Sequence, residues 1–126
     1  MSMRTPLKSV RYLGSAKEGA DHFWQMRLTA VANLFLVIFL VWLIASTVGA
    51  DYAVVKQRLA NPFVDLALIA LVVSGTVHMR MGMQTIIEDY VHSEGLKIVA
   101  LMLNTFFAGA IALACIFSIL KLSLGA

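Results

Sequence analysis

The chain has 126 residues, of which 60% are hydrophobic, and its mean hydropathy is +0.86. This composition excludes an ordinary soluble domain of that size and predicts an all-α integral membrane protein. The net charge of +3 comes from basic residues that flank the apolar stretches, so it indicates no nucleic-acid partner.

The first predicted element is a basic N-terminal segment, residues 1–27, which leads into an apolar helix at about 28–48. Phe23 and Trp24 near the end of this segment are typical of aromatic side chains that lie among lipid headgroups. The apolar stretch is too long for the core of a cleavable signal peptide, and no small-residue cleavage pattern accompanies it. We therefore predict that it is a retained transmembrane helix.

Two further apolar stretches predict helices at about 63–85 and 98–120, so that residues 28–126 form a three-helix membrane anchor domain. Each stretch is close to the ~20 residues that a helix needs to cross a hydrocarbon layer of ~30 Å. A short amphipathic segment follows the first helix. After it, Asn61 and Pro62 favour the start of the second helix.

Lysine and arginine are distributed unevenly on the two sides of the predicted helices. Six of these residues lie before the first helix or in the loop before the third, whereas three lie on the other side. Basic residues favour the cytoplasmic side of a membrane, so we predict a cytoplasmic N-terminus. The six residues are Arg4, Lys8, Arg11, Lys17, Arg27 and Lys97.

The second predicted helix differs from the other two because it carries three ionisable residues, Asp65, His78 and Arg80. Such groups are costly inside a membrane and commonly functional. Gly75 and Gly82 flank His78 on one helix face, which predicts a shallow groove around the imidazole. Three interpretations stay open: a histidine bonded to a neighbouring helix, an axial ligand to haem iron, or part of a proton relay.

Asp89 and Tyr90 follow at the end of the same helix. Eleven residues separate His78 from Asp89, which places the two side chains within about 20° of one helix face and ~16 Å apart along the axis. Tyr90 lies at the depth where the helix should meet the headgroups. A tyrosine at that depth is typical of an interfacial anchor, and a role in a site is the alternative.

These residues resemble a known family, the hydrophobic membrane-anchor subunits of succinate dehydrogenase, respiratory complex II, particularly those of alphaproteobacterial type. The similar pattern is H-x-R-x-G-M-x-x-x-x-E-D-Y. The stretch "FWQMRLTAVANL" at the start of the first helix is also similar to that family. The pattern is formed here by His78, Arg80, Gly82, Met83, Glu88, Asp89 and Tyr90.

The resemblance implies a multi-pass subunit that is embedded in the lipid of the bacterial inner membrane. This subunit would anchor the flavoprotein and iron–sulfur subunits. It also implies a bundle with a second anchor subunit, cytochrome b556, and one b-type haem shared between the two. His78 is then the axial ligand of the haem iron, and Arg27, or alternatively Arg80, contacts a haem propionate. Asp89 and Tyr90 then belong to the site where ubiquinone is reduced, and the Tyr90 hydroxyl bonds a quinone carbonyl.

The other two histidines of the chain, His22 and His92, lie outside the predicted membrane spans. A six-coordinate haem needs two axial ligands. Neither of these histidines is expected to reach the opposite side of an iron held by His78. If haem binds, we therefore expect another chain to supply the second ligand.

The chain is not expected to oxidise succinate by itself, because it has neither a dinucleotide fingerprint nor a cysteine cluster for iron–sulfur ligation. Two alternatives remain, a small proton-coupled transporter subunit and a haem-free structural anchor. Asp65 argues against a transport pathway, because it lies ~220° around the helix from His78 and near the opposite membrane surface. The sequence leaves open ubiquinone or menaquinone, the direction of turnover, a trimeric or monomeric complex, and the roles of Arg80, Glu88 and His92.

Overall fold

The computed structural model describes residues 5–7 and 18–125, and within these ranges the chain is helical with short connections. Three long helices are α2 (Glu18–Thr47), α4 (Pro62–Tyr90) and α5 (Glu94–Ser123), and one short helix is α3 (Tyr52–Leu59). Each long helix contains a stretch that is long and apolar enough to cross a membrane. The all-α membrane fold with three spans is therefore confirmed.

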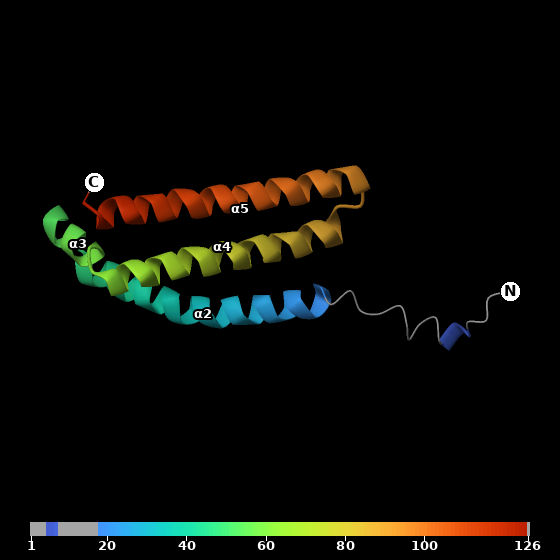
Figure 1. Ribbon diagram of the computed structural model, residues 1–126, viewed down its shortest axis with the longest axis horizontal. Coiled ribbons are helices and arrows are strands. Elements are labelled where there is room, and N and C mark those ends of the chain that lie inside the picture. The colour runs from blue at the N-terminus through green and yellow to red at the C-terminus, as the bar shows by residue number, and fades with distance from the viewer. Residues whose placement is uncertain (1–4, 8–17, 126) are drawn as a thin grey trace.

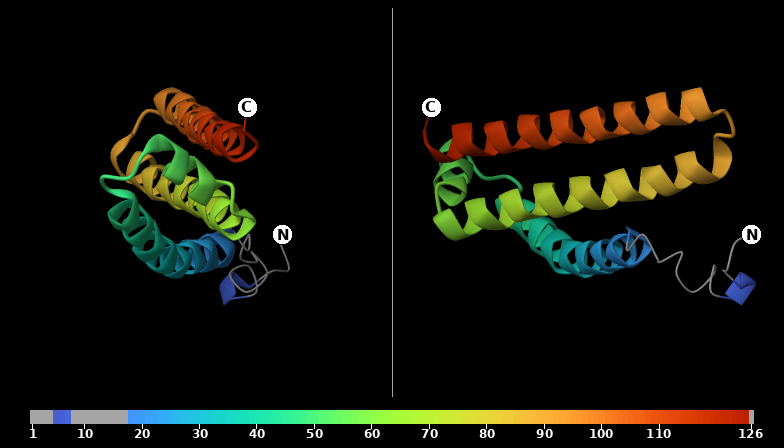
Figure 2. Two further views of the ribbon diagram at one scale, coloured as in Figure 1. Left: turned by 90° about the vertical axis from the view of Figure 1, so that its left-hand side faces the viewer. Right: turned by 45° about the vertical axis from the view of Figure 1, so that its right-hand side comes forward.

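The three long helices lie side by side in alternating directions, with α4 in the middle (Figure 1). Helix α4 packs against α2 on one side and against α5 on the other, and the further views show the same order (Figure 2). The start of α2, the end of α4 and the start of α5 share one end of the bundle. The short helix α3 and the C-terminus lie at the other end.

The long helices extend beyond the apolar stretches from which they were predicted. With 29 or 30 residues each, they are about 44 Å long, whereas the hydrocarbon layer is ~30 Å thick. Helix α2 begins at Glu18, so the last part of the predicted N-terminal segment is helical. Most of that segment, including four of the six basic residues that predict the orientation, lies outside the described residues.

The ends of the helices follow the expected local chemistry. Asn61 caps α4, because its side-chain oxygen accepts a hydrogen bond from the backbone N–H of Phe63 at 3.0 Å, and Pro62 occupies the first turn. The predicted start of this helix is confirmed. The turn after α2 places Gly49 at φ +76°, a conformation that glycine adopts without strain.

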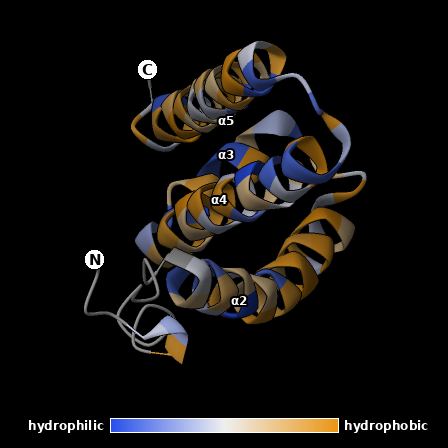
Figure 3. Ribbon diagram, turned by 90° about the vertical axis from the view of Figure 1, so that its right-hand side faces the viewer, coloured by the Kyte–Doolittle hydropathy of each residue, from blue (hydrophilic) through white to orange (hydrophobic). Residues whose placement is uncertain are grey.

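Few side chains are buried within this single chain. Among the described side chains, the buried residues are Leu43, Met81, Ile87, Ala108 and Asn104, and most large apolar side chains face outward. Hydrophobic residues predominate along the three long helices (Figure 3). Such a surface is stable only against lipid or against another apolar protein surface.

Candidate functional site

The candidate site begins where α2 crosses α4. Thr29 of α2 and His78 of α4 face each other there, with the Thr29 hydroxyl oxygen 3.0 Å from the Nδ1 atom of His78. One turn earlier on α4, the Ser74 hydroxyl donates to the backbone carbonyl of Thr29 at 3.3 Å. Both contacts are partly buried, so two hydrogen bonds join the helices at the depth of the imidazole.

A cavity of about 330 Å³ opens beside His78. All its other lining residues come from the first turns of α2, so the cavity lies between the imidazole and the start of that helix. Its volume is at the lower end of the range for small-molecule pockets, and it is open to the outside of the chain. The lining residues are Gly19, His22, Phe23, Met26, Arg27, Ala30 and His78.

The glycines that flank His78 do not serve close packing within this chain. A Cβ atom added at Gly75 or at Gly82 would meet no heavy atom within 4 Å. The two glycine positions are therefore free of contacts from other helices of the described chain. The space is available to a group from outside this chain, either a planar ligand or a helix of another subunit.

Two basic side chains of α2 line the same cavity as His78. The guanidinium carbon of Arg27 lies 5.0 Å from the centre of the Phe23 ring, which holds the cation at the cavity by a cation–π contact. The Nε2 atom of His22 is buried and has no hydrogen-bond partner among the described residues. A buried polar atom without a partner is rare in proteins and calls for a ligand, an ion or water.

Sequence reasoning missed His22 as a cavity residue, because it lies before the apolar stretch and was assigned to the membrane surface. Helical spacing was the signal that could have identified it. His22, Met26 and Thr29 recur at intervals of four and three residues, which places them on one face of α2. Among the described residues, no group of three or more His, Cys, Asp and Glu side chains converges to hold a metal ion.

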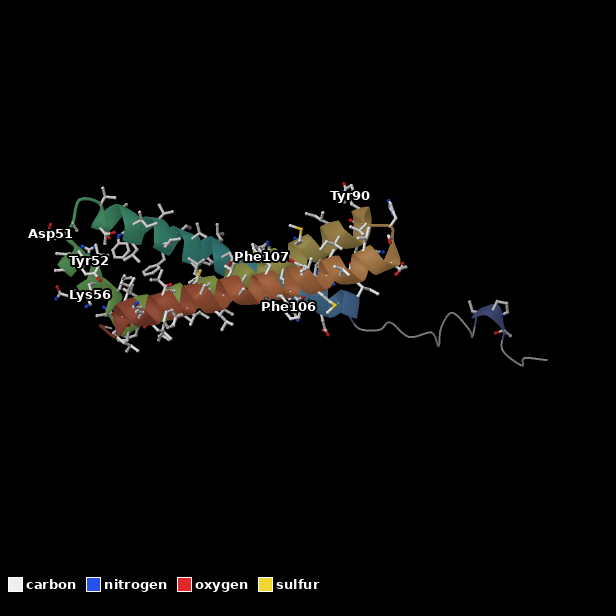
Figure 4. The ribbon with its side chains drawn as sticks, turned by 90° about the horizontal axis from the view of Figure 1, so that it is seen from above. Asp51, Tyr52, Lys56, Tyr90, Phe106 and Phe107 are labelled. Carbon is white, nitrogen blue, oxygen red and sulfur yellow. The ribbon has the colours of Figure 1, made fainter. Side chains whose placement is uncertain are left out.

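Asp89 and Tyr90 lie at the end of α4, away from this cavity. Tyr90 is 77% exposed and projects from the end of the helix (Figure 4). Within the described part of the chain, neither its hydroxyl nor the Asp89 carboxylate forms a hydrogen bond or an ion pair. Twelve residues of helix place Tyr90 about 18 Å along the axis from His78, so the two predicted sites are separate within this chain.

Two further polar residues of α4, Arg80 and Glu88, form their contacts away from this cavity. The Nε atom of Arg80 donates to the Thr105 hydroxyl of α5 at 3.3 Å, which turns this arginine away from α2 and the cavity. The Arg80 carbonyl accepts from the buried Asn104 amide at 2.9 Å. Glu88 accepts from Gln84 on its own helix at 2.8 Å. Of the two arginines considered for a propionate, only Arg27 lies at the cavity.

Asp65 lies in the first turn of α4, at the end opposite to Tyr90. Its Oδ2 atom accepts a hydrogen bond from Ser123 at 2.9 Å, which ties the start of α4 to the end of α5. His78 bonds to α2 instead. The contacts therefore do not join Asp65 and His78 into one polar pathway.

The pattern of the succinate dehydrogenase/fumarate reductase transmembrane subunit family matches residues 1–117. The chain is 30% identical to the succinate dehydrogenase hydrophobic membrane anchor subunit of Paracoccus denitrificans over 97% of this chain and 94% of that protein. It is 27% identical to the subunit of the same name from Rickettsia bellii, over 75% of each chain. No solved structure gives a significant match. The chain belongs to the succinate dehydrogenase membrane anchor family.

Proposed function

We propose that this membrane-anchor subunit shares a b-type haem with a second anchor subunit through His78 and helps to form a ubiquinone-reduction site through Tyr90 and Asp89. The observation that carries the haem proposal is the setting of His78. One ring nitrogen bonds Thr29, and the ring lines a cavity together with two basic residues, Arg27 and His22. Family membership and three membrane-spanning helices support the anchoring function itself.

The anchoring function requires partners that carry the chemistry of succinate oxidation. The chain has no dinucleotide fingerprint and a single cysteine, Cys115, so flavin and iron–sulfur chemistry belong to a flavoprotein subunit and an iron–sulfur subunit. The predicted orientation in the bacterial inner membrane places the start of α2 and the end of α4 at the cytoplasmic side. Both proposed sites then lie in the half of the membrane that faces the soluble subunits.

The residues at the cavity fit a haem. His78 has one ring nitrogen that is not used by Thr29, and imidazole nitrogen is a common axial ligand of haem iron. Gly75 and Gly82, one turn before and after His78, place no side chain beside the imidazole, and no other part of the described chain lies within 4 Å of a Cβ built there. Arg27 and the unpaired Nε2 of His22 are suited to hold carboxylates such as propionates. When bound, a haem supplies one-electron redox chemistry.

The second axial ligand is proposed to come from the second anchor subunit, cytochrome b556. This chain offers a surface that the second anchor subunit can contact. The positions of Gly75 and Gly82 are free of contacts from other helices of the described chain, and most large apolar side chains face outward. A helix of the second subunit that covers this face would lie on the helix that carries His78. A bundle of two anchor subunits therefore accounts for the exposed apolar surface and for the missing ligand together.

At the end of α4, Tyr90 and Asp89 have free polar groups where a quinone ring can approach from the membrane. The Tyr90 hydroxyl is suited to donate a hydrogen bond to a quinone carbonyl oxygen. The Asp89 carboxylate is suited to receive protons from the adjacent water and to pass them to the reduced quinone. Reduction of ubiquinone to ubiquinol takes up two electrons and two protons, and the electrons come from the soluble subunits.

The test is His78→Ala in the assembled complex, with His92→Ala as the matched control. His92 is exposed in the connection between α4 and α5 and lines no part of the cavity. We expect His78→Ala to lose or broaden the low-spin bis-histidine absorbance spectrum of the haem, whereas His92→Ala keeps it. An unchanged spectrum in His78→Ala would exclude this ligand assignment. A wild-type complex without any haem would instead support the haem-free structural anchor.

A further inference from the structure

We propose that Thr29 is a positioning residue, whose hydroxyl accepts a hydrogen bond from the Nδ1–H group of His78 and so holds the imidazole with an unprotonated Nε2. The inference rests on the proposed role of His78 as an iron ligand and assigns a function to a residue of another helix. The Thr29 hydroxyl has a single proton, which it donates within α2, so that its oxygen can only accept from His78.

The hydroxyl of Thr29 has one proton, and its oxygen also accepts hydrogen bonds. The oxygen lies 2.7 Å from the backbone carbonyl of Gln25 and 3.2 Å from that of Met26, both in the preceding turn of α2. Threonine in a helix commonly donates to such a carbonyl, and the 2.7 Å contact is the shortest that this hydroxyl makes. The proton is therefore directed along α2, and a lone pair of the oxygen is left for His78.

The Nδ1 atom of His78 lies 3.0 Å from this oxygen, a normal length for an N–H donor. Because the Thr29 proton is used in α2, the proton between the two atoms belongs to the ring. Neutral imidazole carries one proton, so Nε2 is then the atom with the free lone pair. Metal-bound histidines show the same arrangement, in which the other ring N–H donates to an acceptor that fixes the tautomer and the orientation of the ring.

The position of Thr29 is itself fixed by the fold. The β-branched side chain of threonine has few rotamers in a helix, and the bond to Gln25 selects one of them. The Ser74 hydroxyl donates to the Thr29 carbonyl at 3.3 Å, so that α2 is joined to α4 by the same residue twice. One of these hydrogen bonds reaches the ring of His78, and the other reaches only the backbone.

This difference separates the proposal from a purely structural interpretation. If the Thr29 hydroxyl only helps to hold two helices together, then loss of the Ser74 bond should have effects like those of losing the Thr29 hydroxyl. If the Thr29 hydroxyl sets the tautomer of His78 and the strength with which Nε2 binds iron, then only loss of this hydroxyl should change the haem content and the midpoint potential. A hydrogen bond at Nδ1–H makes Nε2 a stronger donor, which favours ferric over ferrous iron.

The experiment compares Thr29→Val, Thr29→Ser and Ser74→Ala in the full complex, with the haem content and the midpoint potential as readouts. Valine removes the hydroxyl but keeps the branched shape. Serine keeps the hydroxyl, and Ser74→Ala removes the neighbouring bond only. We expect Thr29→Val to retain haem about tenfold less tightly and to raise the potential. A tenfold change in the ratio of ferric to ferrous affinity corresponds to about 59 mV for one electron.

Thr29→Ser and Ser74→Ala should keep the wild-type potential. A wild-type potential and haem content in Thr29→Val, or an equal shift in Ser74→Ala, would overturn the proposal. If Thr29→Val does not assemble, Thr29→Ala removes the same hydroxyl without the bulk and carries the same comparison. His78→Ala shows which of the two hypotheses fails. An unchanged haem spectrum in His78→Ala refutes the assignment of His78 as the iron ligand. A changed spectrum in His78→Ala together with a wild-type potential and haem content in Thr29→Val refutes only the role of Thr29.

Discussion

Tyr90→Phe separates a quinone-binding tyrosine from a tyrosine that only anchors the helix end. The substitution keeps the aromatic ring and removes one hydroxyl. Because Tyr90 is 77% exposed and forms no hydrogen bond within the described chain, its hydroxyl contributes nothing to the stability of this subunit through such contacts. Folding and membrane insertion should therefore be unchanged, and any effect on activity should come from contact with the substrate.

The expected magnitude follows from the bond that is lost. A hydrogen bond to a neutral carbonyl contributes about 0.5–1.5 kcal/mol net, and more where negative charge develops on the oxygen during reduction. Since about 1.4 kcal/mol corresponds to a tenfold change in rate, we expect a tenfold or greater loss of quinone reduction. Succinate oxidation with an artificial acceptor at the flavin or iron–sulfur subunit should remain near the wild-type rate.

The matched control is Tyr52→Phe. Tyr52 is 68% exposed, begins α3 and lies at the opposite end of the bundle from Tyr90 (Figure 4). It should have normal rates in both assays. An equal loss of both activities in Tyr90→Phe would indicate failed docking of the soluble subunits. Unaltered quinone reduction in Tyr90→Phe would show that the hydroxyl has no part in the site and that the residue is an interfacial anchor.

Two further predictions concern the cavity. Expressed without other subunits, the chain should hold little haem and give no stable six-coordinate spectrum, because the face at Gly75 and Gly82 is uncovered; a stable bis-histidine species from the chain alone would contradict this. Arg27→Gln and His22→Gln should each lower haem retention several-fold, measured as haem content after detergent washing. Both variants should keep the low-spin spectrum, because neither changes the iron ligand. Loss of that spectrum in His22→Gln would identify His22 as an iron ligand and refute the inference that another subunit supplies it.

The number and type of the helices were predictable because lipid imposes a simple rule on sequence. A spanning segment needs about 20 apolar residues, and charged residues gather outside it. The same rule could not predict where the helices end. The length of an apolar stretch reports the thickness of the bilayer, whereas α2 continues through polar residues back to Glu18, ten residues before the predicted apolar stretch begins. His22 was assigned to the membrane surface for this reason.

The depth of His78 and its two glycine neighbours indicated a functional residue but left three interpretations open, and its role as a ligand stays a prediction from the family resemblance. The hydrogen-bond partner of His78 was not predictable, because helical periodicity relates residues within one helix and does not say which residue of α2 lies opposite. The packing of α2 against α4 brings Thr29 to the ring although 49 positions separate the two residues. The face of Arg80 was predictable, since two residues turn a helix by ~200°, but its contact with Thr105 again required the packing of α5.

The separation of the two proposed sites makes their tests independent. His78 is partly buried near the crossing of α2 and α4, whereas Tyr90 is exposed about 18 Å further along α4. If His78 binds haem as proposed, a change at Thr29 or His78 should act on the haem spectrum and potential without altering the groups at the end of the helix. If Tyr90 contacts the quinone as proposed, a change at Tyr90 should act on quinone reduction without altering the imidazole or its hydrogen bond. A variant at either position that alters both readouts would therefore indicate movement of α4 as a whole, not loss of a single contact.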